Sequence, residues 1–233
     1  QSMGSALSRN YAAEESNKLS VFETLLSFGT ASLDKQVEEG KSPEELLEWM
    51  NLYFQQLSAV LGEEVVDPYL VLDGKILAVN PWEGDDTYDV YGTEWYQKAV
   101  AADGEAIFTN VYIDAVYNKP VITAAQKCKS AEAVLAFDVF PENFAFQFNH
   151  QELSPGDSFF LCDGAGTVIF RHTELEEDDG AMHQYLGELI RQIEAGELAN
   201  YDDYIIDSDG QTRGVYYTIM ENGWYAILTS PYS

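Results

Sequence analysis

Residues 68–80, PYLVLDGKILAVN, consist of two apolar runs on either side of Asp73-Gly74. An Asp-Gly pair between two such runs is a strong signal for a β-hairpin with a two-residue turn. The pattern returns at residues 158–172, SFFLCDGAGTVIFRH, again as strand, Asp-Gly turn and strand. The chain therefore repeats one architecture, and each copy opens with an antiparallel hairpin.

Two helices are expected before the first hairpin. The first runs from about Leu7 to Glu39 and ends at Gly40, because apolar residues recur at three-four spacing, namely Phe22, Leu25, Leu26, Gly29, Leu33 and Val37. The second starts with Ser42 as N-cap, Pro43 at the first helical position and a capping-box Glu. Its apolar stripe is Leu46, Met50, Tyr53, Phe54, Leu57 and Leu61.

Strands dominate the rest of the chain. After the first hairpin we expect a short helix from Thr93 to about Ala102 and strands near 106–116, 120–127 and 132–140. Residues 141–157 form a crossing segment, and the second hairpin is followed by a helix around 181–195 and three closing strands, with turns at Asp209-Gly210 and Asn222-Gly223. The predicted fold class is α+β, with N-terminal helices in 1–61 and two lobes with antiparallel sheets in 62–148 and 149–233.

The composition excludes several classes of partner. The 233 residues include 12 Lys and Arg against 40 Asp and Glu, a net charge of −28, which repels nucleic acid and anionic membrane surfaces. Two cysteines, Cys128 and Cys162, allow one disulfide without requiring it, and they fall in different predicted lobes. No apolar run reaches the ~18 residues of a transmembrane helix.

Motifs for enzymatic chemistry are not visible. The sequence has no nucleophile elbow, zinc-protease motif, phosphate loop or dinucleotide fingerprint, so we expect no enzyme activity, cofactor or metal. Residues 207–210, Asp-Ser-Asp-Gly, match only part of a calcium loop and are interpreted as a hairpin turn.

Candidate binding residues gather between residues 88 and 138. Strand alternation puts Tyr112 and Asp114 on one face, either toward water or toward a cavity. Asp138 lies in the apolar run AVLAFDVF, residues 133–140, where a carboxylate needs a partner, either within the protein or a ligand ammonium. Trp95 and Tyr96 face different ways on a helix, so one is expected in the core and the other toward a pocket.

The order of these elements resembles the extracytoplasmic double Cache (dCache) sensor family, whose two lobes are PAS-like. The segments that carry the resemblance are WYQKAV at 95–100, VYIDAVYNKPVITAAQ at 111–126 and GWYAILTSP at 223–231. It implies a membrane-distal lobe that binds a ligand, here 62–148, and a membrane-proximal lobe, here 149–233. The implied protein is a transmembrane receptor with membrane helices before and after this region and an extracellular sensor.

In the amino-acid-binding branch of that family, a ligand motif runs over aromatic residues, an arginine and two aspartates. The positions that match it are Tyr88, Trp95, Tyr96, Tyr112, Asp114 and Asp138. The arginine, which grips the ligand carboxylate, falls on Thr93, a residue that also makes a good N-cap. The resemblance therefore favours a small amine-bearing ligand, with Asp114 and Asp138 on the ammonium and the aromatic residues as walls.

Alternatives remain within and outside the sensor class. Within the sensor class, the alternatives to an amine are a neutral ligand such as a nucleobase and a carboxylate held by Lys98, Lys119 or Lys127. An adhesion module for a protein or glycan would show shallow exposed aromatics and no enclosed pocket, and an enzyme acting on sugars would use paired carboxylates. In the receptor interpretation, the chain is a homodimer through the N-terminal helix, and the output is a chemotaxis signalling region, a histidine kinase or a diguanylate cyclase.

Overall fold

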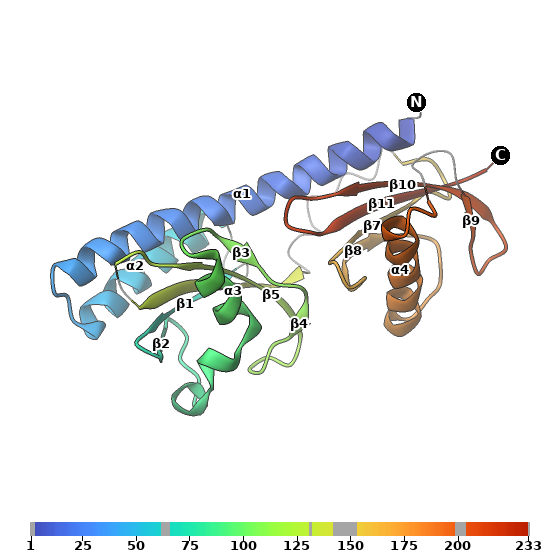
Figure 1. Cartoon of the computed structure of the whole chain (residues 1–233). Coiled ribbons are helices and arrows are strands. Elements are labelled where there is room, and N and C mark those ends of the chain that lie inside the picture. Colours follow the sequence, from blue (N-terminus) through green and yellow to red (C-terminus); the bar gives the residue numbers. More distant parts are fainter. Residues whose placement is uncertain (1–2, 62–65, 131, 142–152, 199–203, 233) are drawn as a thin grey trace. The chain divides into compact units, whose positions relative to one another are not determined.

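The computed structural model describes residues 3–61, 66–130, 132–141, 153–198 and 204–232 (Figure 1). The chain divides into two compact units. One, here the central unit, is Leu19–Asn143; the other, the terminal unit, combines Gln1–Lys18 with Phe144–Ser233. Each unit has one antiparallel sheet with helices against it, which confirms the predicted α+β class with its long N-terminal helix. The predicted domain boundaries at 61/62 and 148/149 adjoin or fall in stretches outside the described residues and stay predictions.

The two expected helices are present with small shifts at their ends. Helix α1 is Met3–Glu38, so it begins four residues before the predicted start, and Gly40 follows it at a φ of +77°. Helix α2 is Pro43–Leu61. Its N-cap is confirmed, because the Ser42 hydroxyl accepts a hydrogen bond from the backbone N–H of Glu45 at 3.2 Å. The side chains of Leu57 and Leu61 lie outside the described part.

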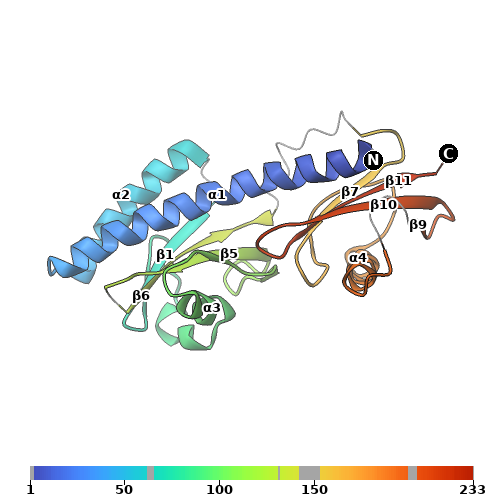
Figure 2. The same cartoon turned by 45° about the horizontal axis from the view of Figure 1, so that its top comes forward.

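The sheet of the central unit has helices on both faces. Its order is β2-β1-β6-β5-β3, with β4 also pairing β5, and the strands are β1 Val66–Leu72, β2 Lys75–Ala78, β3 Ile107–Phe108, β4 Tyr112–Ile113, β5 Pro120–Lys127 and β6 Ala133–Val139. Helices α1 and α2 lie on one side, and α3, Glu94–Ala102, lies on the other (Figure 2). Gly29 permits close packing of α1, since a Cβ there would lie 2.5 Å from Leu135 on β6.

The first hairpin forms as predicted. Leu72 pairs with Lys75, and Asp73 and Gly74 between them have φ values of 51° and 80°, as a type I′ turn requires. The single strand predicted at 106–116 is wrong, because β3 and β4 are separate short strands. Between them the Thr109 hydroxyl accepts a hydrogen bond from the Thr123 N–H at 3.0 Å and takes the place of a backbone acceptor.

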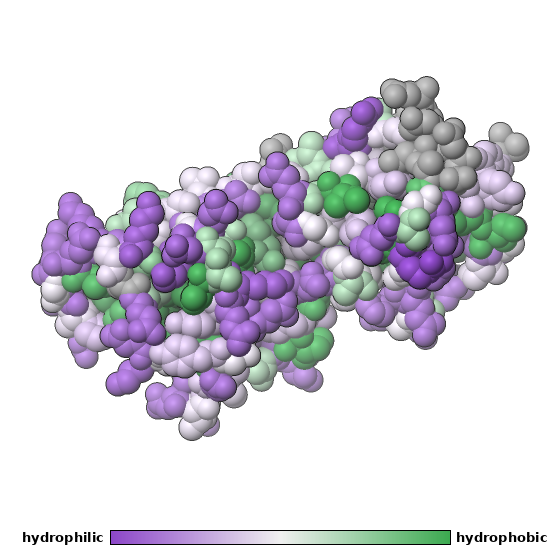
Figure 3. Space-filling view, in the orientation of Figure 1, coloured by the Kyte–Doolittle hydropathy of each residue, from purple (hydrophilic) through white to green (hydrophobic). Residues whose placement is uncertain are grey.

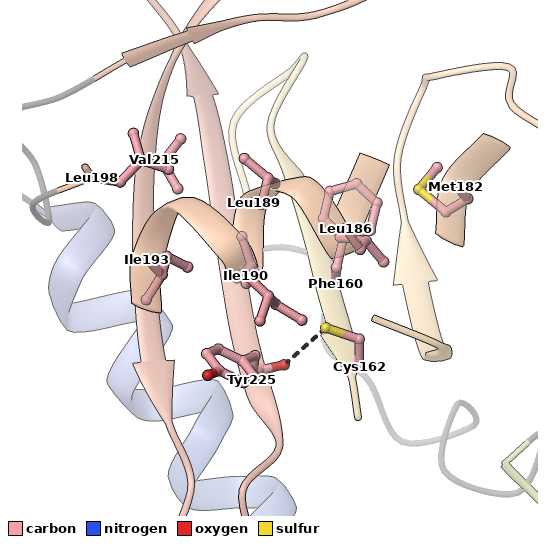
Figure 4. Close-up of a cluster of buried hydrophobic side chains, with 11 residues drawn as sticks. Phe160, Cys162, Met182, Leu186, Leu189, Ile190, Ile193, Leu198, Val215 and Tyr225 are labelled. Carbon is pink, nitrogen blue, oxygen red and sulfur yellow. Dashed lines mark hydrogen bonds between the residues drawn. The ribbon is translucent and has the colours of Figure 1, made fainter. Parts of the chain in front are cut away.

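The terminal unit repeats the arrangement with a second sheet. Its order is β8-β7-β11-β10-β9, and its strands are β7 Ser158–Cys162, β8 Val168–His172, β9 Tyr204–Ile206, β10 Thr212–Ile219 and β11 Tyr225–Pro231. Helix α4, Asp179–Glu194, covers one face with Leu186, Ile190 and other apolar side chains directed at the sheet (Figure 4). On the opposite face, the ring of Tyr11 from α1 packs 4.7 Å from that of Phe159.

Both cysteines are free and buried, Cys128 in the central unit and Cys162 in the terminal unit. Burial raises the pKa of the Cys128 thiol to about 12, which keeps it protonated. No helix in the described ranges has the length and apolar character needed to cross a bilayer. Most of the predicted crossing segment, 141–157, lies outside the described residues.

Hydrophilic residues cover much of the surface visible in Figure 3, in line with the 40 acidic residues. The same view shows a hydrophobic area over β9. There Tyr204 and Ile206 are exposed on the edge strand, and the Tyr204 ring meets that of Tyr232 edge-on. Strand β9 has only three residues, and a short edge limits pairing with other chains.

Candidate functional site

A cavity of about 170 Å³ lies in the central unit, on the sheet face that α3 covers. Its wall draws on β1, β2, β4, β6, α3, the turn after β4 and the 3₁₀ helix η1, Asp85–Thr87. Six aromatic side chains line it: Tyr69, Trp82, Tyr88, Trp95, Tyr112 and Tyr117. Four carboxylates line it as well: Asp67, Asp85, Asp114 and Asp138.

Asp138, on the central strand β6, is one of the two buried carboxylates of the wall. It is 9% exposed, and its Oδ1 accepts hydrogen bonds from the Tyr69 hydroxyl at 2.8 Å and the Thr123 hydroxyl at 3.0 Å. The Thr123 hydroxyl also meets the Tyr112 hydroxyl, and because each hydroxyl has one proton, Tyr112 donates to Thr123. Internal partners thus satisfy one oxygen of Asp138 and orient its carboxylate toward the cavity.

Burial dominates the electrostatics of this carboxyl. It raises the pKa of Asp138 to about 7, and the nearby carboxylates of Asp114 and Asp67 act in the same direction against the two hydrogen bonds. Burial also raises the pKa of Tyr69 and of Tyr112, so both remain hydroxyl donors. Near neutral pH Asp138 therefore changes between its neutral and charged forms at small cost, and a cation in the cavity would favour the charged form.

Asp114 combines a structural role with its place on the wall. It begins the turn between β4 and β5, where its Oδ2 accepts hydrogen bonds from the N–H groups of Val116 at 3.1 Å and Tyr117 at 2.6 Å. The side chain is 8% exposed. The predicted face with Tyr112 and Asp114 is therefore turned toward the cavity and away from bulk water.

The predicted site residues on and before helix α3 take different places in the structure. The side chains of Trp95 and Tyr96 are both buried in the core cluster, but only Trp95 also lines the cavity, where it meets the Tyr69 ring edge-on at 5.4 Å. Tyr96 packs against the half-exposed ring of Tyr91. Thr93 is the N-cap of α3: its hydroxyl accepts from the Tyr96 N–H at 3.3 Å and donates to the Val90 carbonyl at 2.7 Å. Neither Thr93 nor Tyr96 belongs to the cavity wall.

Of the predicted residues, the structure brings together Tyr88, Trp95, Tyr112, Asp114 and Asp138. Tyr88 lies at the mouth, 37% exposed, and burial together with the nearby carboxylates of Asp138 and Asp114 raises its pKa.

Sequence reasoning missed the part of the wall that comes from β1, β2 and the segment after them. Asp67 and Tyr69 alternate with Pro68 and Leu70, so period-two reading of the first hairpin could have found them. The strand register places Asp67 directly opposite Asp138. The other missed wall residues with polar or aromatic side chains are Asn80, Trp82 and Asp85, and Tyr117 in the turn after β4.

No lysine, arginine or histidine belongs to the wall as far as the chain is described. The three lysines considered as bases for a ligand carboxylate are not part of it. Lys98 pairs with Glu94 at 2.8 Å, and Lys127 pairs with Asp103 at 3.3 Å. Lys119 lies beside the wall, with its ammonium 4.1 Å from the centre of the Phe140 ring and 5.9 Å from that of the wall residue Tyr117.

Solved chemoreceptor domains share the fold. The ligand-binding domain of CtaA from Pseudomonas fluorescens, in complex with L-serine, matches with a TM-score of 0.72 at 17% identity, over 97% of this chain and 94% of that one. The ligand-binding domain of Tlp3 from Campylobacter jejuni, in complex with 4-methylisoleucine, matches with a TM-score of 0.70 at 16% identity, over 98% of this chain and 89% of that one. At such identities the likeness concerns the fold.

Sequence comparison finds two curated relatives, both methyl-accepting chemotaxis proteins of Bacillus subtilis. TlpB is 28% identical over 124 residues, which are 53% of this chain and 18% of the relative. McpB is 30% identical over 145 residues, which are 62% of this chain and 21% of the relative. The chain thus spans about a fifth of the length of these relatives. No family profile matches the chain.

Proposed function

Because this chain has the fold of the double Cache sensor domains, as the sequence resemblance predicted, we propose that it is the extracytoplasmic ligand-sensing region of a chemotaxis receptor. The cavity of the central unit binds a small amine in this proposal. The curated relatives, both methyl-accepting chemotaxis proteins, favour a chemotaxis output over a histidine kinase or a diguanylate cyclase. Tethering to the membrane and dimerisation through α1 belong to the same proposal.

The observation that carries the proposal is the environment of Asp138. The carboxyl is buried, one oxygen is held by Tyr69 and Thr123, and aromatic rings surround the space in front of it. An ammonium placed there makes a charge-assisted hydrogen bond and meets aromatic faces, which together are the usual means of holding an amine.

Thr93 narrows the class of ligand. CtaA and Tlp3 are described in complex with amino acids, which carry an ammonium and a carboxylate. Here the family's arginine position holds Thr93, whose hydroxyl is occupied in capping α3. The described wall has no lysine, arginine or histidine that could replace the arginine. A ligand carboxylate would meet four aspartates without a counter-charge, so an amine without a carboxylate fits better.

The strand β5 offers a route from the cavity to α1. Thr123 on its cavity face bonds to Asp138, while Gln126 on its other face bonds to Ser27 and Thr30 of α1, each at 3.3 Å. Ligand binding favours the conformation of the β5–β6 pair that binds more tightly, and these contacts pass the preference to α1.

An adhesion module or a sugar-cleaving enzyme fits this cavity less well. Ligand pockets usually measure about 300–1,000 Å³. The present cavity, at about 170 Å³, takes a small metabolite and leaves no room for a glycan chain.

A thermal-shift screen tests the proposal. We expect n-butylamine and related amines to raise the melting temperature, whereas acetate, butyrate and nucleobases leave it unchanged. A ligand at about a hundred times its Kd adds about 2.7 kcal/mol of stability. Stabilisation by carboxylates or α-amino acids with none by amines would overturn the amine proposal.

The affinity for the amine should depend on pH through Asp138. An ammonium binds the charged carboxylate, so affinity is expected to rise about ten-fold per pH unit up to about pH 7 and then to level off. Without ligand the sign reverses: the folded-state pKa is raised, so the contribution of Asp138 to stability falls as pH rises from about 4 to about 7. Isothermal titration calorimetry across this range measures the pH dependence of the affinity, and urea unfolding measures that of the stability. Asp138→Asn should flatten the first and remove from the second the part that Asp138 contributes.

A further inference from the structure

The cavity holds more negative charge than one ammonium requires. A single ammonium is satisfied by one or two carboxylates and an aromatic face. The described wall has four carboxylates and no basic side chain. Asp114 and Asp138 are buried and Asp67 and Asp85 half-buried, so their like charges repel one another at a cost, and a ligand with one positive charge would offset only part of that cost.

Each of the four carboxylates has one oxygen held by the protein. Asn80 donates to Oδ1 of Asp67 at 2.9 Å, and the Trp82 N–H donates to Oδ2 of Asp85 at 2.9 Å. Asp114 and Asp138 are held through Oδ2 and Oδ1 by the partners described above. The second oxygen of each has no hydrogen-bond partner within the described ranges, so all four retain an oriented acceptor.

The four acceptors come from four elements of the wall: Asp67 from β1, Asp138 from β6, Asp85 from η1 and Asp114 from the turn after β4. Asp67 and Asp138 are cross-strand neighbours in the β1–β6 pair, whereas Asp85 and Asp114 come from segments outside that pair. Burial raises the pKa of the Asp67 carboxyl against the hydrogen bond from Asn80, and the nearby charges of Asp114 and Asp85 act in the same direction as burial. The carboxyls of Asp67, Asp114 and Asp85 thus lie close enough to influence one another, in line with their shared place on the wall.

Resting on the amine-sensing function proposed above, we propose that the ligand is a small aliphatic diamine. One ammonium meets the spare oxygen of Asp138 and the second meets that of Asp85, and Asp67 and Asp114 supply further acceptors. The aromatic rings enclose the methylene chain between them. The small volume, about 170 Å³, restricts the ligand to a short chain.

Calorimetry with compounds of one chain length tests this assignment. Putrescine, n-butylamine and γ-aminobutyrate all have four carbons. Putrescine carries two ammonium groups, n-butylamine carries one, and γ-aminobutyrate carries one ammonium and one carboxylate. A hydrogen bond to a charged group contributes about 1.5–3 kcal/mol, so putrescine is expected to bind about 10- to 150-fold more tightly than n-butylamine. γ-Aminobutyrate should bind more weakly than n-butylamine. Cadaverine and diaminopropane, which are one carbon longer and one carbon shorter than putrescine, test whether the cavity prefers another chain length.

Variants assign the second ammonium to its partners. Asp85→Asn keeps an oxygen to accept from the Trp82 N–H and is expected to lower the putrescine affinity toward that of n-butylamine, with the n-butylamine affinity nearly unchanged. Asp67→Asn should weaken both amines, because Asp67 lies opposite Asp138. Asp86→Asn is the matched control, because Asp86 is an exposed neighbour in η1 and not part of the wall.

The outcomes separate the two proposals. If n-butylamine binds as tightly as every diamine, the diamine proposal is overturned and amine sensing stands. If Asp85→Asn weakens both amines equally, the assignment of a second ammonium to Asp85 is overturned. If no amine binds while an α-amino acid or an organic acid does, the amine-sensing function fails, and the diamine proposal fails with it.

Discussion

Asp138→Asn is expected to lower the affinity of the central cavity for an amine by about 30-fold or more, because removing one partner of a buried charge pair costs about 2–5 kcal/mol. The substitution keeps an oxygen that accepts from Tyr69 and Thr123, so the local hydrogen bonds and the fold should persist. Calorimetric titration measures the affinity, and the thermal unfolding profile shows that the domain is folded. Asp138→Ala is expected to abolish binding without unfolding the domain.

Stability gives Asp138→Asn a second readout. The wild-type carboxylate is buried at a cost, so the variant should be at least as stable as the wild type above about pH 7. Unchanged affinity in a folded variant would show that Asp138 does not pair with the ligand. A variant that binds and unfolds like the wild type at every pH would also contradict the raised pKa.

Arg213→Met is expected to destabilise the terminal unit by about 3–5 kcal/mol, because it leaves a buried carboxylate without its counter-charge. Arg213, on β10, is 3% exposed, and its Nε pairs with Asp207, whose side chain is fully buried. The guanidinium also meets Asp209 at 3.1 Å and the Gly156 carbonyl. Burial raises the pKa of Asp207 in spite of the arginine, so removal of Arg213 favours the protonated acid further.

Urea unfolding of the full chain measures this loss. Arg191→Met is the matched control: Arg191 pairs with Glu188 at 2.8 Å and with Glu197 at 3.1 Å but is half exposed, and exposed pairs contribute about 0–1 kcal/mol. The double variant Arg213→Met with Asp207→Leu removes both charges and should recover much of the stability. A loss below about 1 kcal/mol in Arg213→Met alone would contradict the buried pair.

The same contacts explain why residues 207–210 form a turn. Asp207 and Asp209 face Arg213, and the Gly210 N–H donates to the Asp207 carbonyl at 2.9 Å with Gly210 at a φ of +80°. The interpretation of this segment as a hairpin turn is thereby confirmed. Arg213, which lies beyond the four-residue motif, supplies the positive charge for the two aspartates.

Local patterns alone determined the element order of this protein. Asp73-Gly74 predicted the first hairpin because few residue pairs accept two positive φ angles, and Ser42-Pro43 predicted the start of α2 because capping depends on neighbours three residues away. The α+β class and the resemblance to sensor domains followed from that order. The break in the strand predicted at 106–116 could not be predicted from local patterns. It occurs where the Thr109 hydroxyl accepts a hydrogen bond from Thr123, which is fourteen residues away in the sequence.

The binding site depended on tertiary structure to a greater extent. The sequence placed Tyr112, Asp114 and Asp138 on suitable strand faces, since alternation is a local property. That Asp67 lies opposite Asp138 is a matter of strand register between segments about seventy residues apart, and only folding sets it. Which of Trp95 and Tyr96 reaches the cavity depends on how α3 is rotated against β5, and packing of its apolar face decides that rotation. The chain alone thus determined that carboxylates and aromatics would gather in one lobe, whereas the fold decided how many of them share one cavity and how many charges a ligand must carry to match them.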